Sequence, residues 1–419
     1  MSSDYKPSVD GIIAAAATLQ NVVDLSPLQK SEFLSDLFEA EIYLKREDLQ
    51  IVRSYKLRGA FNFLSNISEE QRKNGVVCAS AGNHAQGFAF SCERLGIKGT
   101  VFMPTTTPKQ KVRQVSYIGK ESVEVVLHGD TYDDAKEFAV KFCKENNMTF
   151  VSPFDHPLII EGQGTVGKEI MEQCGNEQPD FVFIPIGGGG LSAGCSLYIK
   201  SKNSSIQIIG AEPKGAPAMY ESFRKGNVVR LDKIDSFVDG AAVREVGHYT
   251  YEICKRLLDD IVLVPEGRIC TYILEMYDRA AIVAEPAGVL SIAALVDYKD
   301  KIKGKKVVCI LSGGNNDINR MPLIKEKSLL FEGLKHYFVV TFPQRAGALK
   351  EFVNMVLGPT DDITLFEYTK KNTKEAGPAL VGIEIAKKDD YQPLLDRMTK
   401  YGIDYKLLNE DPTLFNFLV

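Results

Sequence analysis

Short apolar runs alternate with longer amphipathic runs between residues 75 and 152. The apolar runs predict strands at 76–79, 99–103, 123–127 and 149–152. The amphipathic runs predict a helix that ends at Leu95 and helices at 109–118 and 131–146. Because strands and helices that alternate in this way form parallel sheets covered on both faces, we expect an α/β domain here.

A second series of the same kind surrounds the first. It comprises predicted strands at 41–45, 181–186, 207–211 and 306–311, a predicted helix that ends at Leu64, and predicted helices at 165–174, 192–201 and 268–281. Two such series predict two packed α/β domains with parallel sheets. Ligands of such sheets bind beyond the carboxyl ends of the strands, and three glycine-rich segments of this chain fall at those ends.

The pattern changes at residue 322. Residues 322–333 contain a proline, a run of charged residues and a Glu-Gly pair, and we interpret them as a linker. Beyond them the predicted elements follow the order βαββαβ, with strands at 337–342, 363–370, 380–386 and 405–408 and helices at 348–356 and 391–400. This order predicts a small C-terminal α+β domain of the ferredoxin-like type.

Composition and charge limit the kinds of partner. The chain has 419 residues, 25% of them charged, and its net charge of −5 disfavours a large nucleic-acid surface. We find no signal peptide and no apolar run long enough to span a bilayer, so we expect a cytoplasmic protein without nucleic-acid or membrane partners. The eight cysteines are scattered without metal-ligand spacing, which indicates buried free thiols and no metal site.

One lysine, Lys56, lies in an unusual setting. Tyr55 and Leu57 flank it with apolar bulk, and Gly59 allows another backbone to approach closely. Burial lowers the pKa of a lysine, and we expect the like charge of Arg58 to lower the pKa of Lys56 further. A lysine that loses its proton can act as a nucleophile or a base. The alternative is an exposed lysine at the start of a helix.

The segment from Ser80 to Gly87 directly follows a predicted strand. A glycine turn that begins a helix presents free backbone N–H groups and the positive end of the helix dipole, which suit a carboxylate or phosphate. Asn83 adds a donor and an acceptor. The alternative is an ordinary strand-to-helix turn with a polar N-cap.

Two further glycine-rich segments follow strands. The four consecutive glycines at 187–190 cost more backbone entropy than a turn requires, so we favour a phosphate site there. Ser312, at the end of the last predicted strand, offers a neutral hydrogen bond to a ring nitrogen. Glu285 precedes a proline and is a further acidic candidate, although an exposed glutamate at a helix start fits equally well.

A lysine nucleophile, a glycine cradle for one phosphate, an asparagine and a neutral partner for a ring nitrogen together fit one cofactor, pyridoxal 5'-phosphate. With these motifs in this order, nearly the whole chain resembles the threonine dehydratases (threonine ammonia-lyases), in the fold-type II, tryptophan-synthase-β-like class of pyridoxal-phosphate enzymes. The resemblance implies that Lys56 holds the cofactor covalently, that Asn83 bonds the pyridoxal 3'-oxygen and that Ser312 bonds the pyridine nitrogen. The residues implied to hold the phosphate are Gly187, Gly188, Gly189, Gly190 and Leu191. Those implied to surround the substrate carboxylate are Ser80, Ala81, Gly82, Asn83 and His84.

The resemblance also implies a reaction. L-threonine would lose water to give an enamine, which water then hydrolyses to 2-oxobutanoate and ammonia. This is the first step of isoleucine biosynthesis, and L-serine would be a secondary substrate. Lys56 would take the Cα proton, and the catalytic candidates beside it are Ser80 and Glu285, the latter to orient the β-hydroxyl.

The C-terminal segment resembles the ACT-like regulatory domain of the same family. Residues 345–349 match its Arg-Pro-Gly-Ala-Leu segment, with Ala346 in place of proline. The resemblance implies inhibition by L-isoleucine, with L-valine as a second candidate effector, through a site that includes Arg345, Gly347, Leu349 and Phe352. It also implies a homodimer or homotetramer.

The expected organisation is a catalytic region at 1–321, a linker at 322–333 and a regulatory domain at 334–419. Within the catalytic region we expect a small subdomain at about 52–152 and a large one formed by 1–51 and 153–321.

Two alternatives remain open. The first is a serine dehydratase or serine racemase. Related racemases carry a serine where this chain has Ala81, and their cation site begins at a glutamate that matches Glu212, but Ala218 stands where a carboxylate ligand is needed. We therefore expect no metal. The second alternative is a non-catalytic regulator that binds amino acids, but such a protein has no need of the complete lysine, glycine and asparagine set.

Overall fold

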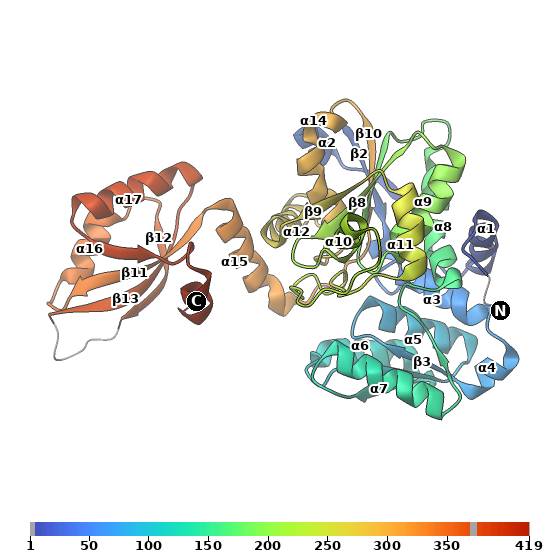
Figure 1. Ribbon diagram of the computed structural model, residues 1–419. Helices are drawn as coiled ribbons and strands as arrows, with labels where there is room; N and C mark the ends of the chain where they lie inside the picture. The colour runs from blue at the N-terminus through green and yellow to red at the C-terminus, as the bar shows by residue number, and fades with distance from the viewer. Residues whose placement is uncertain (1–4, 369–374, 419) are drawn as a thin grey trace. The chain divides into compact units, whose positions relative to one another are not determined.

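The computed structural model describes residues 5–368 and 375–418. The chain forms two compact units, Met1–Asp317 and Ile318–Val419. Figure 1 shows strands flanked by helices in the first unit and a small sheet with α16 and α17 on one side in the second. The predicted α/β fold with a C-terminal α+β domain is confirmed.

The larger sheet of the first unit has six strands. In spatial order they are β1 (Leu28–Lys30), β2 (Glu41–Arg46), β10 (Lys306–Leu311), β7 (Phe181–Pro185), β8 (Gln207–Pro213) and β9 (Asp260–Val264). All neighbours are parallel except the edge strand β1, which pairs antiparallel with β2. The central strands are apolar on both faces because helices cover both sides.

The smaller sheet of the first unit has four parallel strands. In spatial order they are β5 (Val123–Leu127), β4 (Gly99–Met103), β3 (Val76–Ala79) and β6 (Thr149–Phe150). Three of these strands have the predicted bounds, and the fourth is two residues shorter than predicted. The assignment of residues 52–152 to a separate subdomain stays a prediction, because residues 1–317 form one compact unit.

Helices pack around both sheets. They are α1 (Val9–Thr18), α2 (Glu32–Phe38), α3 (Lys56–Ser65), α4 (Glu69–Asn74), α5 (Asn83–Leu95), α6 (Lys109–Gly119), α7 (Tyr132–Glu145), α8 (Pro157–Cys174), α9 (Gly190–Lys202), α10 (Ala218–Lys225), α11 (His248–Leu257), α12 (Glu266–Ala280), α13 (Leu290–Ala293) and α14 (Lys299–Ile302). A short 3-10 helix, η1 (Glu47–Leu49), follows β2, and others are η2 (Lys120–Ser122) and η3 (Ala294–Tyr298). All eight cysteines are buried and free, as predicted.

Helix α8 begins eight residues before its predicted start at residue 165. The prediction was wrong because the first half of α8 is rich in glycine, a composition that is typical of loops. These glycines serve close helix packing instead. A Cβ on Gly162 would lie 2.6 Å from Cα of Gly59 in α3, and a Cβ on Gly194 in α9 would lie 2.2 Å from the carbonyl oxygen of Ile160.

The second unit contains one antiparallel sheet. Its strands, in spatial order, are β12 (Asp362–Tyr368), β13 (Ala376–Glu384), β11 (Lys335–Pro343) and β14 (Asp404–Leu407). Its helices are η4 (Ile318–Arg320), α15 (Met321–Glu332), α16 (Ala348–Val356), η5 (Lys388–Asp390), α17 (Tyr391–Lys400) and α18 (Pro412–Leu418). This is the βαββαβ order predicted from the sequence, with α18 added at the end.

The segment predicted as a linker, 322–333, is mostly helix α15. The prediction was wrong because exposed charged residues such as Lys325 and Glu332 belong to a helix whose Ile324 is buried. Glu326 also accepts a hydrogen bond from the Tyr337 hydroxyl on β11 at 2.6 Å. The helix therefore belongs to the second unit, and the boundary follows Asp317 rather than residue 321.

Candidate active site

A cavity of about 810 Å³ opens in the first unit. Its walls come from the segments that follow β3, β7 and β10, from the first turn of α3 and from residues 230–248. The predicted site residues on its wall are Lys56, Ser80, Ala81, Gly82, Asn83, His84, Gly188 and Glu285. The site therefore lies at the carboxyl ends of parallel strands, as the sequence indicated.

Lys56 is the first residue of α3, and its Nζ donates a hydrogen bond to the carbonyl oxygen of Pro153 at 2.9 Å. Burial lowers its pKa to about 8, against a smaller opposing effect from the Glu285 carboxylate. The predicted contribution of Arg58 was wrong. The Arg58 guanidinium is paired with Glu47 and Glu169, and it takes no part in the shift of the Lys56 pKa.

A chain of hydrogen bonds joins three polar residues on the cavity wall. Asn315 donates to Oδ1 of Asn83 at 2.7 Å, and Asn83 donates to Oε1 of Glu285 at 2.6 Å. Burial, and next the charge of Asp239, raise the pKa of Glu285 to about 7. Glu285 is therefore a buried carboxyl that can be neutral or ionised near neutral pH, and the alternative of an exposed glutamate is wrong.

The loop from Ser80 to His84 ends in an uncapped helix. Gly82, in the N-cap position of α5, offers no side chain, and among the described residues the backbone N–H groups of Asn83, His84 and Ala85 have no acceptor. These groups can receive an anion. The Ser80 hydroxyl accepts the N–H of Gly82 at 3.2 Å.

His84 is buried and neutral. Its Nε2 lies 3.1 Å from the carbonyl oxygen of Val151, which can only accept, so Nε2 carries the proton. Burial, and next the charge of Lys56, lower the pKa of His84 to about 3. His84 therefore adds no positive charge to the site at physiological pH.

The four glycines form a close-packed turn into α9. Gly189 has a φ of 91°, and a Cβ on Gly188 would lie 2.2 Å from the ring of Phe154. Within the described part of the chain, the N–H groups of residues 187–191 donate to no acceptor. A cradle that has no room for side chains and presents unpaired N–H groups fits a phosphate.

Ser312 is buried at the end of β10, and its hydroxyl donates to the carbonyl oxygen of Ala287 at 3.3 Å. Its predicted bond to a pyridine nitrogen stays a prediction. Ser54, which bridges to Gly313, has a buried hydroxyl without a hydrogen-bond partner in the described structure.

Several residues of the cavity wall were not predicted from the sequence. Arg53 lies on the wall with a φ of 56°, a backbone conformation that an arginine in a sequence does not signal. Asp133 on α7 pairs with Arg230 and Arg244, which lie in an irregular segment. Such pairs join residues about a hundred positions apart, and no local pattern indicates them.

Comparison with known proteins identifies the family. Residues 19–313 match the family described as pyridoxal-phosphate dependent enzyme. The chain belongs to this family. Residues 326–418 match the C-terminal regulatory domain of threonine dehydratase. Pyridoxal phosphate is therefore the cofactor, as predicted, and the free N–H groups at 187–191 and the buried amine of Lys56 fit it.

Two relatives that are more than 50% identical to this chain carry one name. The chain is 57% identical over 414 residues to the biosynthetic L-threonine dehydratase of Halalkalibacterium halodurans, covering 99% of this chain and 100% of that protein. It is 55% identical to the protein of the same name from Bacillus subtilis, over 98% and 97% of the two chains. The structure of processed threonine deaminase isoform 2 from Solanum lycopersicum superposes with a TM-score of 0.72 at 39% identity, over 77% and 95% of the chains. The predicted resemblance to threonine dehydratases is confirmed.

The predicted regulatory residues lie around the start of α16. Gly347 has a φ of 87°, Arg345 pairs with Glu351, Phe352 is buried, and Leu349 is 43% exposed. Phe352 packs in the core on one face of the sheet.

Leu365 on β12 does not belong to the apolar cluster that contains Phe342 and Phe352. A register shift between Ile363 and Leu365 turns Leu365 toward the cluster of Tyr337 on the opposite face of the sheet.

The described residues contain neither a helix that could span a membrane nor a cluster of metal ligands. In residues 5–368 and 375–418, no helix is both long enough and apolar enough to cross a bilayer. In the same residues no group of three acidic, histidine or cysteine side chains is arranged to hold a metal. Glu212 instead accepts the backbone N–H groups of Met219 and Tyr220 at 2.7 and 2.9 Å, at the start of α10.

Proposed function

We propose that the protein converts L-threonine to 2-oxobutanoate and ammonia, with L-serine as a secondary substrate. The observation that carries this proposal is the buried amine of Lys56, whose pKa is lowered to about 8 and which faces a cavity beside the chain from Asn315 through Asn83 to Glu285. The names of the relatives support threonine as the substrate. The first step of isoleucine biosynthesis is the corresponding metabolic role.

The proposed mechanism assigns a task to each part of the wall. Bound pyridoxal phosphate supplies an electron sink that acidifies the Cα–H bond of an amino acid. The free N–H groups at the start of α5 hold the substrate carboxylate, together with the hydroxyl of Ser80. Neutral Lys56 takes the Cα proton at Nζ. Glu285 orients the β-hydroxyl, because its pKa of about 7 lets it donate or accept a hydrogen bond near neutral pH.

We propose that three segments of the chain hold different parts of the cofactor. The N–H groups from Gly187 to Leu191 hold the phosphate, Asn83 bonds the 3'-oxygen, and Ser312 bonds the pyridine nitrogen once its hydroxyl leaves Ala287.

The pH dependence of cofactor capture tests the state of Lys56. Only the neutral amine reacts, so the rate at which apoenzyme captures pyridoxal phosphate covalently should fall about tenfold per pH unit below 8 and level off above it. Because the Glu285 carboxylate raises the pKa of Lys56, Glu285→Gln should move the break to lower pH. Stopped-flow absorbance measures both profiles. A rate that keeps rising to the ordinary lysine pKa would contradict the burial argument.

A racemase is the nearest alternative, since the structure of maize serine racemase superposes with a TM-score of 0.71 at 28% identity. Racemisation requires an acid or base on each face of Cα, and Ala81 supplies none. Chiral chromatography after incubation with L-serine and L-threonine should therefore show 2-oxo acids and no D-isomer. Substantial D-serine or D-threonine would contradict a dehydratase-only activity.

We further propose that the second unit binds a branched-chain amino acid, L-isoleucine or with lower affinity L-valine, and lowers threonine turnover. The match to a regulatory domain supports this role. The start of α16 after Gly347 presents backbone N–H groups for a carboxylate, and exposed Leu349 is available to contact a branched side chain. A domain used only for subunit pairing is the alternative. The proposed assembly is a cytoplasmic homodimer or homotetramer.

Leu349→Asp tests the effector site. Leu349 is exposed, so the variant should fold and saturate with threonine normally without isoleucine. Its response to isoleucine should weaken about tenfold or more, within the usual range of allosteric coupling. Met355→Asp, an exposed position on the same helix, is the matched control and should respond normally. If full-length enzyme neither responds to isoleucine or valine nor binds them in calorimetry, the pairing role stands.

A further inference from the structure

The first turn of α3 begins without a helix cap. Lys56 is its first residue, and Tyr55 in the N-cap position makes no side-chain hydrogen bond to the helix. An uncapped start forgoes about 1 kcal/mol, and within the described residues the N–H groups of Lys56 and Leu57 have no acceptor. Tertiary contacts of neighbouring residues must therefore hold Lys56 at the cavity.

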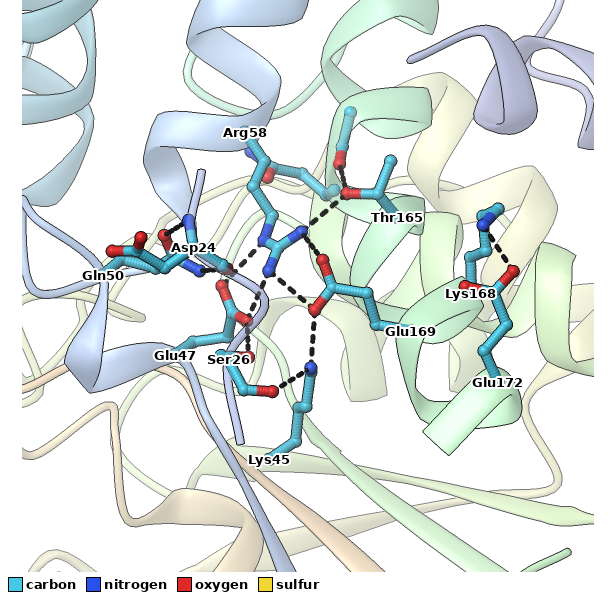
Figure 2. A network of polar contacts seen from close by, with 12 residues as sticks. Asp24, Ser26, Lys45, Glu47, Gln50, Arg58, Thr165, Lys168, Glu169 and Glu172 are labelled. Atoms are coloured by element: carbon cyan, nitrogen blue, oxygen red, sulfur yellow. Dashed lines mark hydrogen bonds and ion pairs between the residues drawn. The ribbon is translucent and has the colours of Figure 1, made fainter. Parts of the chain in front are cut away.

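Arg58, one residue beyond Leu57 in the same turn, makes those contacts. Figure 2 shows its guanidinium between two carboxylates. Nε and Nη2 donate to Glu47 at 2.8 Å each, and Nη1 and Nη2 donate to Glu169 at 2.6 and 3.0 Å. Nη1 also donates to Thr165 Oγ1 at 3.1 Å, so all five N–H donors of the guanidinium are used.

The partners tie α3 to separate parts of the unit. Glu47 lies in η1 after β2, whereas Glu169 lies on α8. Lys45 on β2 completes the network, since its Nζ donates to Glu169 at 2.5 Å and to the carbonyl oxygen of Ser26 at 2.7 Å. Two cations and two carboxylates thus balance inside the protein, and breaking one pair would leave a buried charge without its partner.

Arg58 affects the position of Lys56 rather than its pKa. Burial and Glu285 set the Lys56 pKa, and Arg58 takes no part in that shift. Arg58 and Lys56 share one helical turn, and α3 crosses α8 so closely that a Cβ on Gly162 would lie 2.7 Å from the carbonyl oxygen of Arg58. A displacement of the guanidinium therefore moves the backbone that carries the amine.

We propose that Arg58 is a positioning residue for Lys56, whose five-donor contacts fix the first turn of α3 and aim Nζ into the cavity. The inference rests on the proposed threonine turnover. Lysine keeps the charge of Arg58 but has three donors on a single nitrogen, so it cannot form two bidentate carboxylate pairs.

The test compares holoenzymes of wild type, Arg58→Lys and Lys45→Gln. Lys45→Gln is the matched control, because it removes a cation from the same network without touching α3. Both variants should melt at lower temperature than wild type. Arg58→Lys should lose about tenfold or more in kcat with KM changed less than about twofold, as expected for a misplaced reacting group, whereas Lys45→Gln should keep kcat within about twofold.

Two outcomes would overturn the proposal. One is a soluble Arg58→Lys enzyme with the kcat of wild type, and the other is an equal loss of kcat in Lys45→Gln, which would show that the network acts only through stability. If Arg58→Lys is insoluble, Thr165→Val decides instead. It leaves one guanidinium donor unpaired at small structural cost and should lower kcat about threefold, so an unchanged kcat overturns the proposal.

Failure of the proposed function is distinguishable from failure of this inference. If wild type does not turn over threonine, the rate of covalent pyridoxal phosphate capture by apoenzyme replaces kcat in the comparison. That rate should still be lower for Arg58→Lys than for wild type and Lys45→Gln, and equal rates overturn the positioning role.

Discussion

Replacing Lys56 with alanine is expected to lower threonine turnover by about 10³-fold or more, because the proposed base and the covalent attachment point are lost together. The fold should survive, since in the described structure the Lys56 side chain makes a single hydrogen bond, from Nζ to the carbonyl oxygen of Pro153. Steady-state release of 2-oxobutanoate and circular dichroism measure the two effects. The purified wild type should be yellow, and borohydride should remove the colour.

The same experiment has a chemical control. After borohydride treatment of wild type, mass spectrometry should find the reduced cofactor on the peptide that contains Lys56, and Lys56→Ala should carry no such adduct. Lys73→Ala changes an exposed lysine at the end of α4 and should behave as wild type. Threonine turnover by Lys56→Ala near the wild-type rate would refute the role assigned to this residue.

Gly188→Ala is expected to weaken pyridoxal phosphate binding by about tenfold or more. The new Cβ would lie 2.2 Å from the Phe154 ring, so either the ring or the glycine turn must move, and overpacking of this kind costs about 1–3 kcal/mol. Fluorescence titration of apoenzyme with the cofactor measures the change. Binding should weaken rather than turnover alone, because the displaced N–H groups are those proposed to hold the phosphate.

A second substitution separates the steric cause from other effects. Phe154→Leu in the Gly188→Ala background removes the ring that the new Cβ meets and should restore part of the cofactor affinity. Unchanged affinity in Gly188→Ala would contradict the phosphate assignment. Reduced affinity without any recovery in the double variant would contradict the steric explanation.

Local pattern was sufficient to predict much of the fold. The strand bounds at 76–79, 99–103 and 123–127 were correct because these short runs are rich in valine and other apolar residues and are bounded by polar turns. The start of α8 was not predicted because its glycines are typical of loops. Helix α15 was not predicted because its run of charged residues is typical of linkers. In both cases tertiary packing overrides the local signal.

Only part of the candidate site could be predicted from the sequence. Lys56 and the glycine-rich segments were found because each belongs to a compact motif. The bond from Asn83 to Glu285 joins residues 202 positions apart, and the bond from Arg58 to Glu169 joins residues 111 apart. From the sequence we therefore predicted an electrostatic effect of Arg58 on Lys56. In the structure the Arg58 guanidinium instead pairs with the carboxylates of Glu47 and Glu169.

Incubation of the full-length protein with pyridoxal phosphate and L-threonine tests the central claim most directly. Quantitative chromatography and an ammonia electrode should find 2-oxobutanoate and ammonia released in equal amounts, in proportion to the threonine consumed, and the reaction should stop after borohydride treatment. Binding of threonine without release of either product would contradict the proposed activity and would favour a regulator that binds amino acids without converting them.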